Sequence, residues 1–287
     1  MFLQQCLNGL ILGGAYALIS VGMTMIFGIM NISNFAHGTI YMLGGYCIYF
    51  LSTAFKTPFL IGVAISMLVV GLIGVAIERI VFRPVYGAPV LNDLLIALGL
   101  SFVLENGALL LWGSQTKSVR TPFTDVVFHF FSVSVTLQRL IALAASVILI
   151  AGLYVFLNYT RFGKAIVATA QNPKGAALVG IDLDHIYMAT FAISSGLAAA
   201  AGALLAPLFY VFPTMGSMPL LKAFVVVVLG GMGNVQGAVV GGFLVGIAES
   251  LGGAYISSDY KNVFAFIILI GVLLLRPQGL FGRSESS

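Results

Sequence analysis

Long apolar stretches, separated by short polar ones, run along the entire chain. A bilayer core about 30 Å thick is crossed by a helix of roughly 20 apolar residues. The pattern therefore predicts an all-α, polytopic transmembrane helical bundle of about eight or nine spans. The predicted helices are Leu7 to Met30, Thr39 to Phe55, Phe59 to Val81, Leu94 to Trp112, Leu137 to Leu157, Tyr187 to Tyr210, Leu220 to Gly231, Ala238 to Tyr255 and Val263 to Leu275.

A weak internal repeat interrupts two of these runs. Gly28-x2-Asn31-x6-Gly38 recurs as Gly231-x2-Asn234-x6-Gly241. The run that ends at the second copy is too short to span alone, which indicates a half-helix. Gly-interrupted segments in the two halves of transporters open the backbone where it lines a path. The candidates for a translocation path are Asn31, Asn34, Phe35, His37, Gly38, Gly230, Gly231, Gly233, Asn234 and Gly241.

Each candidate also has a structural interpretation. The three asparagines could hold unwound backbone or meet a zwitterion, and a structural hydrogen bond is favoured for His37 over contact with substrate. Gly230, Gly231 and Gly233 fit close helix packing and free φ angles better than ligand contact.

Composition excludes a water-soluble fold. The 287 residues are 60% apolar and 8% charged, and the mean hydropathy is +1.09, whereas soluble domains carry roughly 25% charged residues. We therefore expect one membrane domain over residues 1–287, without a cleaved signal peptide. The net charge of +4 is scattered over loops without a basic stripe, which argues against nucleic acid.

The polar stretch from Asn158 to Ile186 predicts a short amphipathic helix. Asn172 is a helix N-cap followed by Pro173, the favoured first helical residue, and Gly180 is a helix stop. A helix from Pro173 to Val179 is too short to be stable alone, so it needs its surroundings or a partner. Basic residues divide almost evenly between the two sides of the bundle and barely decide its orientation.

Two acidic residues lie well inside predicted spans rather than near an end, Glu105 and Glu249. An ionised carboxylate at mid-membrane costs about 2.5 to 3.5 kcal/mol, so each should face protein or water, or be neutral. For Glu105 a buried hydrogen bond near the interface is favoured over the substrate path, and for Glu249 a structural partner such as a backbone group. Both would be ion carriers if the chain were a stand-alone channel or an ion-coupled transporter.

Chemistry-bearing motifs are absent from the sequence. Neither His37 nor His129 has partners at metal-ligand spacing, and Cys6 and Cys47 lie in apolar segments as packing residues. A Walker-type element is also missing, so we expect no nucleotide, no cofactor, no metal and no enzymatic activity.

Several ordered blocks resemble the permease subunits of branched-chain amino acid ABC importers, specifically the LivH type. The blocks are Gln4-Gln5-Cys-Leu-Asn-Gly-Leu, Tyr16-Ala-Leu, Asn34-Phe-Ala-His-Gly38, Arg161-Phe-Gly-Lys-Ala165, Gln171, Ala177-x2-Gly180-Ile-Asp182, Leu229-Gly-Gly-x-Gly233, Gly241-Gly242, Gly246-Ile-Ala-Glu249, Tyr260-Lys261 and Arg276-Pro-Gln-Gly-Leu-Phe-Gly282. They cover nearly the whole chain in order.

The resemblance implies a set of partners in a bacterial inner membrane. These are a second permease subunit, two cytoplasmic ATPases that supply the energy, and a soluble extracytoplasmic binding protein that delivers the amino acid. It also implies that residues 159–186 form a cytoplasmic loop coupled to an ATPase, and permeases for urea or short amides are the nearest alternative. The predicted coupling residues are Arg161, Gly163, Lys164, Ala165, Gln171, Asn172, Pro173 and Gly180.

Overall fold

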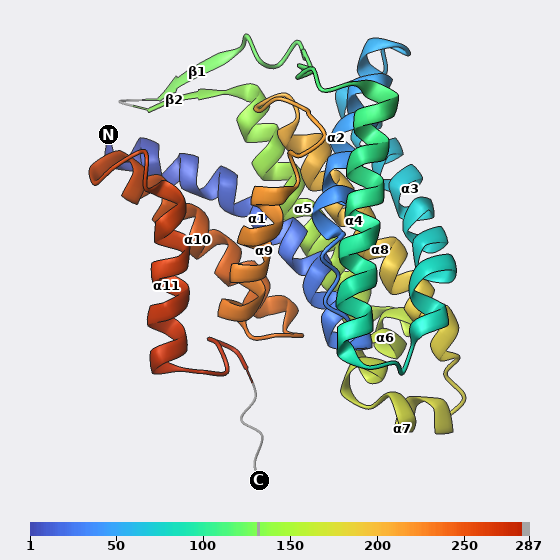
Figure 1. Cartoon of the computed structure of the whole chain (residues 1–287). Coiled ribbons are helices and arrows are strands. Elements are labelled where there is room, and N and C mark those ends of the chain that lie inside the picture. Colours follow the sequence, from blue (N-terminus) through green and yellow to red (C-terminus); the bar gives the residue numbers. More distant parts are fainter. Residues whose placement is uncertain (131–132, 283–287) are drawn as a thin grey trace.

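Helices make up nearly all of the regular structure in the computed structural model, which describes residues 1–130 and 133–282. Each predicted apolar run coincides with most of one helix, so the all-α prediction is confirmed, although the runs predicted to end at Phe55, Val81, Tyr210 and Gly231 extend past the ends of their α-helices (Figure 1). The helices are α1 (Phe2–Met30), α2 (His37–Thr53), α3 (Phe59–Ile77), α4 (Val90–Trp112), α5 (Leu137–Tyr159), α6 (Arg161–Gln171), α7 (Pro173–Leu178), α8 (Leu183–Leu205), α9 (Ser217–Gly230), α10 (Val235–Tyr255) and α11 (Lys261–Leu275).

Three smaller elements were not predicted. A π-helix at Glu78–Phe82 and a 3-10 turn at Arg83–Val85 continue α3, and strands β1 (Val127–Phe130) and β2 (Val133–Thr136) form an antiparallel hairpin. The prediction also missed α6, the amphipathic helix between α5 and α7. These elements lie in the polar stretches, where apolar run length carries no information.

Six of the helices are long and apolar enough to cross a membrane: α1, α3 with its extension, α4, α5, α8 and α10. The chain is therefore a multi-pass membrane protein. Helices α9 and α11 are shorter apolar helices, and α9 has 14 residues, as expected of a half-helix. Helices α1 and α8 are the most buried and form the centre, while α4 and α5 are mostly exposed.

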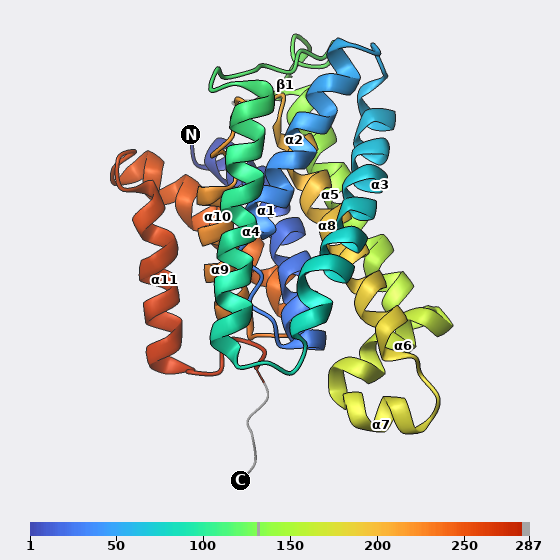
Figure 2. The ribbon, with the colours of Figure 1, turned by 45° about the vertical axis from the view of Figure 1, so that its right-hand side comes forward.

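The two ends of the bundle differ. Helices α6 and α7 project from one end, where the described chain also finishes, and the β1–β2 hairpin and the N-terminus lie at the opposite end (Figures 1 and 2). Gln4 ties the N-terminal segment to the hairpin, because its Nε2 donates to the Ser134 carbonyl oxygen at 3.0 Å. We call these the α7 end and the hairpin end.

The two copies of the repeat contact each other but differ in conformation. A Cβ placed on Gly28 would lie 2.7 Å from the Gly233 Cα. Asn31 ends α1 in the left-handed region at φ 55°, whereas Asn234 begins α10 in extended backbone and accepts from the Gly237 N–H. One copy therefore closes a helix and the other opens one.

Candidate functional site

Helices α1 and α10 approach each other so closely that only small residues fit between them. A Cβ on Gly9 would lie 2.6 Å from the Ile247 Cα, and one on Gly246 would lie 2.4 Å from the Gly13 backbone nitrogen. Glycines four residues apart on each helix form the small-xxx-small pattern that lets membrane helices touch through their backbones. This seam brings Tyr16 of α1 beside Glu249 of α10.

A buried ion pair lies on this seam. The Lys222 Nζ of α9 donates to Glu249 Oε2 at 2.7 Å and to the Tyr16 hydroxyl oxygen at 2.8 Å. The Tyr16 hydroxyl also donates to Glu249 Oε2 at 3.0 Å, and the Lys222 ammonium lies 5.0 Å from the centre of the Tyr16 ring. Since the Lys222 and Glu249 side chains are only 10% and 3% exposed, each is the compensating charge for the other.

The sequence prediction for Glu249 needs a correction in its detail. A structural partner was expected, with a backbone group as the example, and the partner is the side chain of Lys222. Lys222 itself was not singled out, although it is a lone lysine inside the predicted run Leu220 to Gly231. Opposite charges in two apolar runs are a signal for such a pair, because each relieves the desolvation of the other.

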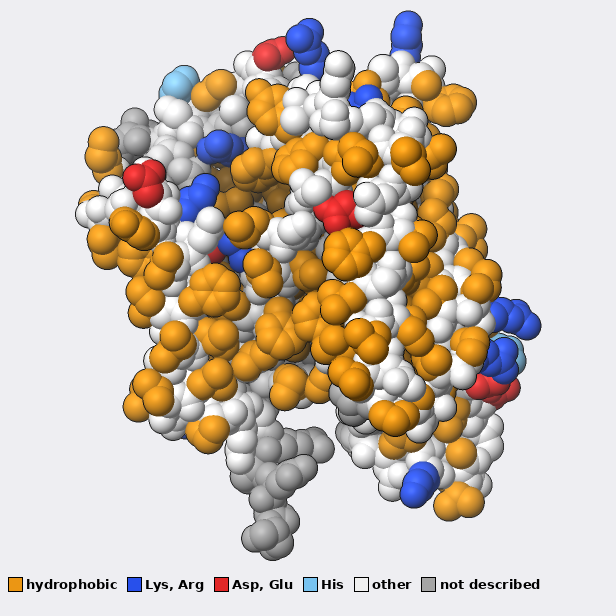
Figure 3. Space-filling view, in the orientation of Figure 1, with side chains coloured by type: hydrophobic (Ala, Val, Ile, Leu, Met, Phe, Trp, Pro, Cys, Tyr) orange, Lys and Arg blue, Asp and Glu red, His pale blue; other side chains and the backbone are white. Residues whose placement is uncertain are grey.

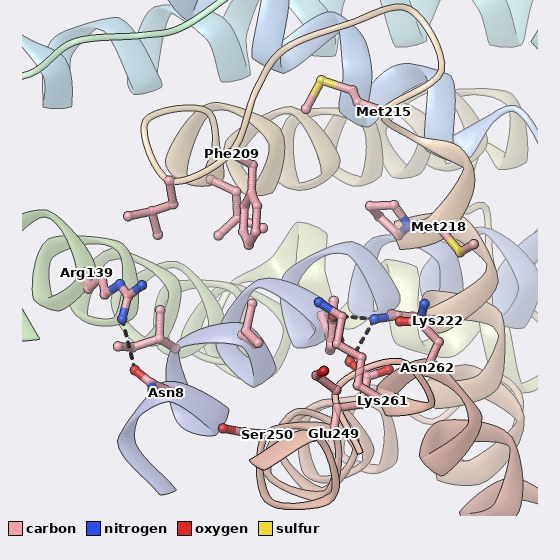
Figure 4. Close-up of a pocket in the computed structure, with 18 of the residues that line it drawn as sticks. Asn8, Arg139, Phe209, Met215, Met218, Lys222, Glu249, Ser250, Lys261 and Asn262 are labelled. Atoms are coloured by element: carbon pink, nitrogen blue, oxygen red, sulfur yellow. Dashed lines mark hydrogen bonds and ion pairs between the residues drawn. The ribbon is translucent and has the colours of Figure 1, made fainter. Parts of the chain in front are cut away.

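A cavity of about 620 Å³ opens above the ion pair. Gln5, Asn8 and Arg139 line its side toward the hairpin end, and the Arg139 Nη1 donates to Asn8 Oδ1 at 3.0 Å. Figure 3 shows the hollow with basic side chains around it, and Figure 4 shows Lys222 and Glu249 together at its edge. The volume lies within the range of small-molecule sites, roughly 300 to 1,000 Å³.

The residues predicted to form a path gather elsewhere. None of the described residues that line this cavity belongs to the predicted set. Gly231 and Asn234 pack toward the C-terminal segment, where Asn234 Nδ2 donates to the Phe281 carbonyl oxygen at 3.1 Å, and Gly233 packs against Gly28. Gly231 and Gly233 have φ angles of +98° and +82°, so the expected backbone freedom is used there. Gly230 contacts Gly237, and Gly241 packs on Leu229.

The first predicted break is a buried turn. Asn34 Oδ1 accepts from the Ala36 N–H at 3.1 Å, and His37 Nε2 lies 3.0 Å from the Ile19 carbonyl oxygen. Gly38, on the first turn of α2, meets Gly216 just before α9, since a Cβ on Gly38 would lie 2.5 Å from the Gly216 oxygen. Phe35 stacks on Phe224 of α9. Helix α2 therefore begins against the start of the half-helix.

Comparison with known proteins places this architecture. Residues 5–273 match the family model described as the permease component of the branched-chain amino acid transport system. The chain belongs to this permease family. The family relation confirms the resemblance inferred from the sequence blocks.

Named relatives cover the chain almost completely. The high-affinity branched-chain amino acid transport system permease protein LivH of Escherichia coli K12 is 39% identical, over 99% of this chain and 96% of its own length. The permease protein BraD of Pseudomonas aeruginosa is 37% identical over 99% and 97%. The probable LivH of Methanocaldococcus jannaschii is 27% identical over 96% and 91%. No solved structure gives a significant match.

The predicted coupling residues of the permease lie at the α7 end, where most are exposed and Gly163 is buried. Thr160 caps α6 by accepting from the Gly163 N–H at 2.9 Å, and Asn172 caps α7 by accepting from the Gly175 N–H at 2.9 Å. Arg161, Lys164 and Gln171 are exposed on α6, and Ala165 and Pro173 are half-buried. Gly180 has a φ of +86° after α7, which ends at Leu178, one residue before the predicted end.

The next helix of the permease is anchored by polar contacts at the same end. His185 Nδ1 lies 2.7 Å from Asp182 Oδ2, and this hydrogen bond lowers the pKa of the Asp182 carboxyl. Arg83, after α3, forms an ion pair with Asp184. These contacts cap the start of α8 and tie it to the extension of α3.

Glu105 lies apart from the Lys222–Glu249 pair. It is half-buried on α4 and lines a recess of about 350 Å³ together with Asn106, Phe212 and Thr214. The neighbouring Asn106 Nδ2 donates to the Phe102 carbonyl oxygen at 2.8 Å. The structure therefore does not bring the two intramembrane acids together.

Proposed function

We propose that this chain is a membrane-spanning permease subunit of an ATP-driven importer for branched-chain amino acids, delivered by a soluble binding protein. The observation that carries the proposal is the match of the whole chain to the permease family, with named relatives near 39% identity. The cavity between α1, α9 and α10 supports it, because its apolar walls and charged edge suit a small amphiphilic solute.

The orientation follows from the same proposal. We place the α7 end in the cytoplasm of a bacterium, against one of two ATPase subunits, and the hairpin end toward the binding protein. Exposed Arg161 and Lys164 support a docking role, as do Leu178 and Val179, which are 89% and 77% exposed at the tip of the projection. The cavity then faces the side from which substrate arrives. A second permease subunit would complete the path, and the chain itself would hydrolyse no ATP.

Two other functions are less well supported. An ion-coupled transporter or channel would need free carboxylates along one path, whereas Glu249 is already neutralised by Lys222 and Glu105 lines a separate recess on α4. A urea or short-amide permease of the same family would need little apolar wall, whereas this cavity is lined by leucines, methionines and phenylalanines. Leucine uptake against urea uptake separates the amino acid permease from the urea or short-amide permease.

Co-purification tests the assembly. The chain, purified in mild detergent from its own cells, should bring along an ATPase with Walker motifs. Replacing Arg161 and Lys164 with Glu should abolish that recovery, because both exposed charges would be reversed. A matched control variant also carries two replacements by Glu, at Lys56 and Arg120, which are exposed basic residues outside the α6–α7 projection. Equal ATPase recovery by both double variants would contradict the docking role.

Reconstitution tests the activity. Proteoliposomes that hold the complete importer and its binding protein should take up leucine only when ATP is present on the ATPase side. The chain reconstituted alone should show no leucine uptake under an ion gradient. Uptake without the ATPases would overturn the importer.

A further inference from the structure

The Lys222–Glu249 pair does not use all of its hydrogen-bonding groups. Glu249 Oε2 accepts from both Lys222 and Tyr16, but Oε1 is buried and has no partner among the described residues. An ammonium group has three N–H donors, and Lys222 directs two of them to Glu249 and Tyr16. A pair that served the fold alone would gain from satisfying the remaining carboxylate oxygen.

The charges around the cavity define what can enter. The pair itself is neutral, so a buried ligand with one net charge would leave that charge uncompensated. Arg139 and Lys261 add positive charge to the lining, and Glu249 is the acidic residue among the described lining residues. The rim therefore attracts a carboxylate first, and Glu249, the one acidic partner for an ammonium among the described lining residues, lies beside Lys222.

One wall of the cavity is apolar, whereas Ser250, Ser258 and Asn262 add neutral polar groups elsewhere in the lining. The apolar wall is built from the end of α8, the segment that follows it and the first turn of α9, with Tyr16 beside the ion pair. Such a surface holds aliphatic groups by burial and offers few polar partners. The residues are Leu205, Leu208, Phe209, Phe212, Met215 and Met218.

We propose that this cavity is a transient binding site for an aliphatic amino acid in its zwitterionic form. The inference rests on the proposed function and names a substrate site within it. The ligand carboxylate pairs with Lys222, the ligand ammonium pairs with Glu249, and the aliphatic side chain lies on the apolar wall. Binding exchanges one ion pair for two, so neither buried charge loses its partner at any point. A net charge on the ligand side chain would break this balance, which makes the site selective for neutral amino acids.

Direct binding tests the site without the binding protein. The complete importer in nanodiscs is incubated with radiolabelled leucine, and two fragments compete: 4-methylpentanoate, which lacks the ammonium, and 3-methylbutylamine, which lacks the carboxylate. Both fragments should compete at least tenfold more weakly than leucine, because each leaves one member of the pair without a partner.

Each charge variant should lose its preference for leucine over one of the two fragments. Glu249→Gln should narrow the gap between leucine and 4-methylpentanoate, and Lys222→Gln should narrow the gap between leucine and 3-methylbutylamine, each by roughly tenfold. A purely structural pair would weaken all three ligands equally. Equal weakening, or no leucine binding by the unaltered importer at millimolar concentration, would overturn the site.

A cavity-filling variant leaves the pair intact. Met218 is 56% exposed on α9 and lines the cavity, so Met218→Trp should reduce leucine binding at least tenfold. Leu72→Trp is the control, since Leu72 is 66% exposed on α3 and does not line the cavity. Unchanged binding by Met218→Trp would count against the site.

Uptake distinguishes this inference from the proposed function. ATP-driven leucine uptake that is equal in the unaltered importer and in all three cavity variants would leave the function standing and remove the site. The opposite result would be no ATP-driven leucine uptake while the two charge variants bind the fragments as predicted. It would keep the site and remove the function.

Discussion

The α1–α10 seam and the α6–α7 projection use the same small residues for opposite purposes. In the seam, glycines bring two backbones into contact and enclose an ion pair that is almost fully buried. In the projection, Gly163 lets α6 fold back on the end of α5, and most side chains remain exposed. Substitutions in the seam should therefore change the stability of the fold, whereas substitutions on the surface of the projection should change binding to a partner.

The largest effect should come from breaking the ion pair. Lys222→Met leaves Glu249 buried without a compensating charge, which should destabilise the isolated chain in detergent by about 3 to 5 kcal/mol. Replacing Glu249 with Leu in the same chain should recover most of this loss. The control is Lys164→Met on the exposed face of α6, which should change stability by less than about 0.5 kcal/mol. Similar unfolding curves for the two single variants would remove the contrast between the regions.

Two equally exposed leucines should respond differently to charge. Leu110 on α4 is 86% exposed and Leu178 on α7 is 89% exposed. Leu110 lies two residues before the end of α4, so Leu110→Asp should reduce membrane insertion, but by less than the roughly 2.5 to 3.5 kcal/mol that a charge costs at the centre of a span. The proposed orientation places Leu178 in water, so the Leu178→Asp chain should insert normally, and only ATPase activity coupled to transport should fall. Glycosylation-site insertion assays measure the first effect, and equal insertion would contradict the placement of α7 outside the bilayer.

A bulky residue in the seam should separate α1 from α10. Gly246→Leu would place a side chain where the Gly13 backbone lies, and overpacking of this kind costs about 1 to 3 kcal/mol. Gly107→Leu on α4 is the matched control, because a Cβ there meets nothing within 4 Å. The melting temperature of each variant in detergent gives the comparison, and an equal shift would show that the seam tolerates volume.

The smallest effect should be the loss of a cap in the projection. Asn172→Ala removes the side-chain acceptor for the Gly175 N–H and should destabilise α7 by about 1 kcal/mol. Faster hydrogen exchange limited to Pro173–Leu178 is the expected readout. Asn158→Ala is the control, since that side chain bonds the preceding turn of α5 rather than capping a helix. Faster exchange throughout α8 would show that the projection is part of the core.

Local signals in the sequence were sufficient for the apolar helices and for the cap of α7. The run Phe59 to Val81 predicted α3 because a spanning helix must be continuously apolar. The Asn172–Pro173 pair predicted the start of α7 because both preferences act within one turn. Helix α6 was not predicted, because Arg161, Lys164 and small residues interrupt its sequence and leave no long apolar run.

The sequence by itself determined three things: that the chain is a membrane protein, which residues form its apolar helices, and to which permease family it belongs. The sequence predicted a translocation path at the breaks near Asn31 and Asn234, because glycine and asparagine next to apolar runs indicate opened backbone. The tertiary structure alone joined Tyr16, Lys222 and Glu249, which lie as much as 233 residues apart. Apolar periodicity shows which residues avoid water, but a buried charge finds its partner only through the packing of whole helices.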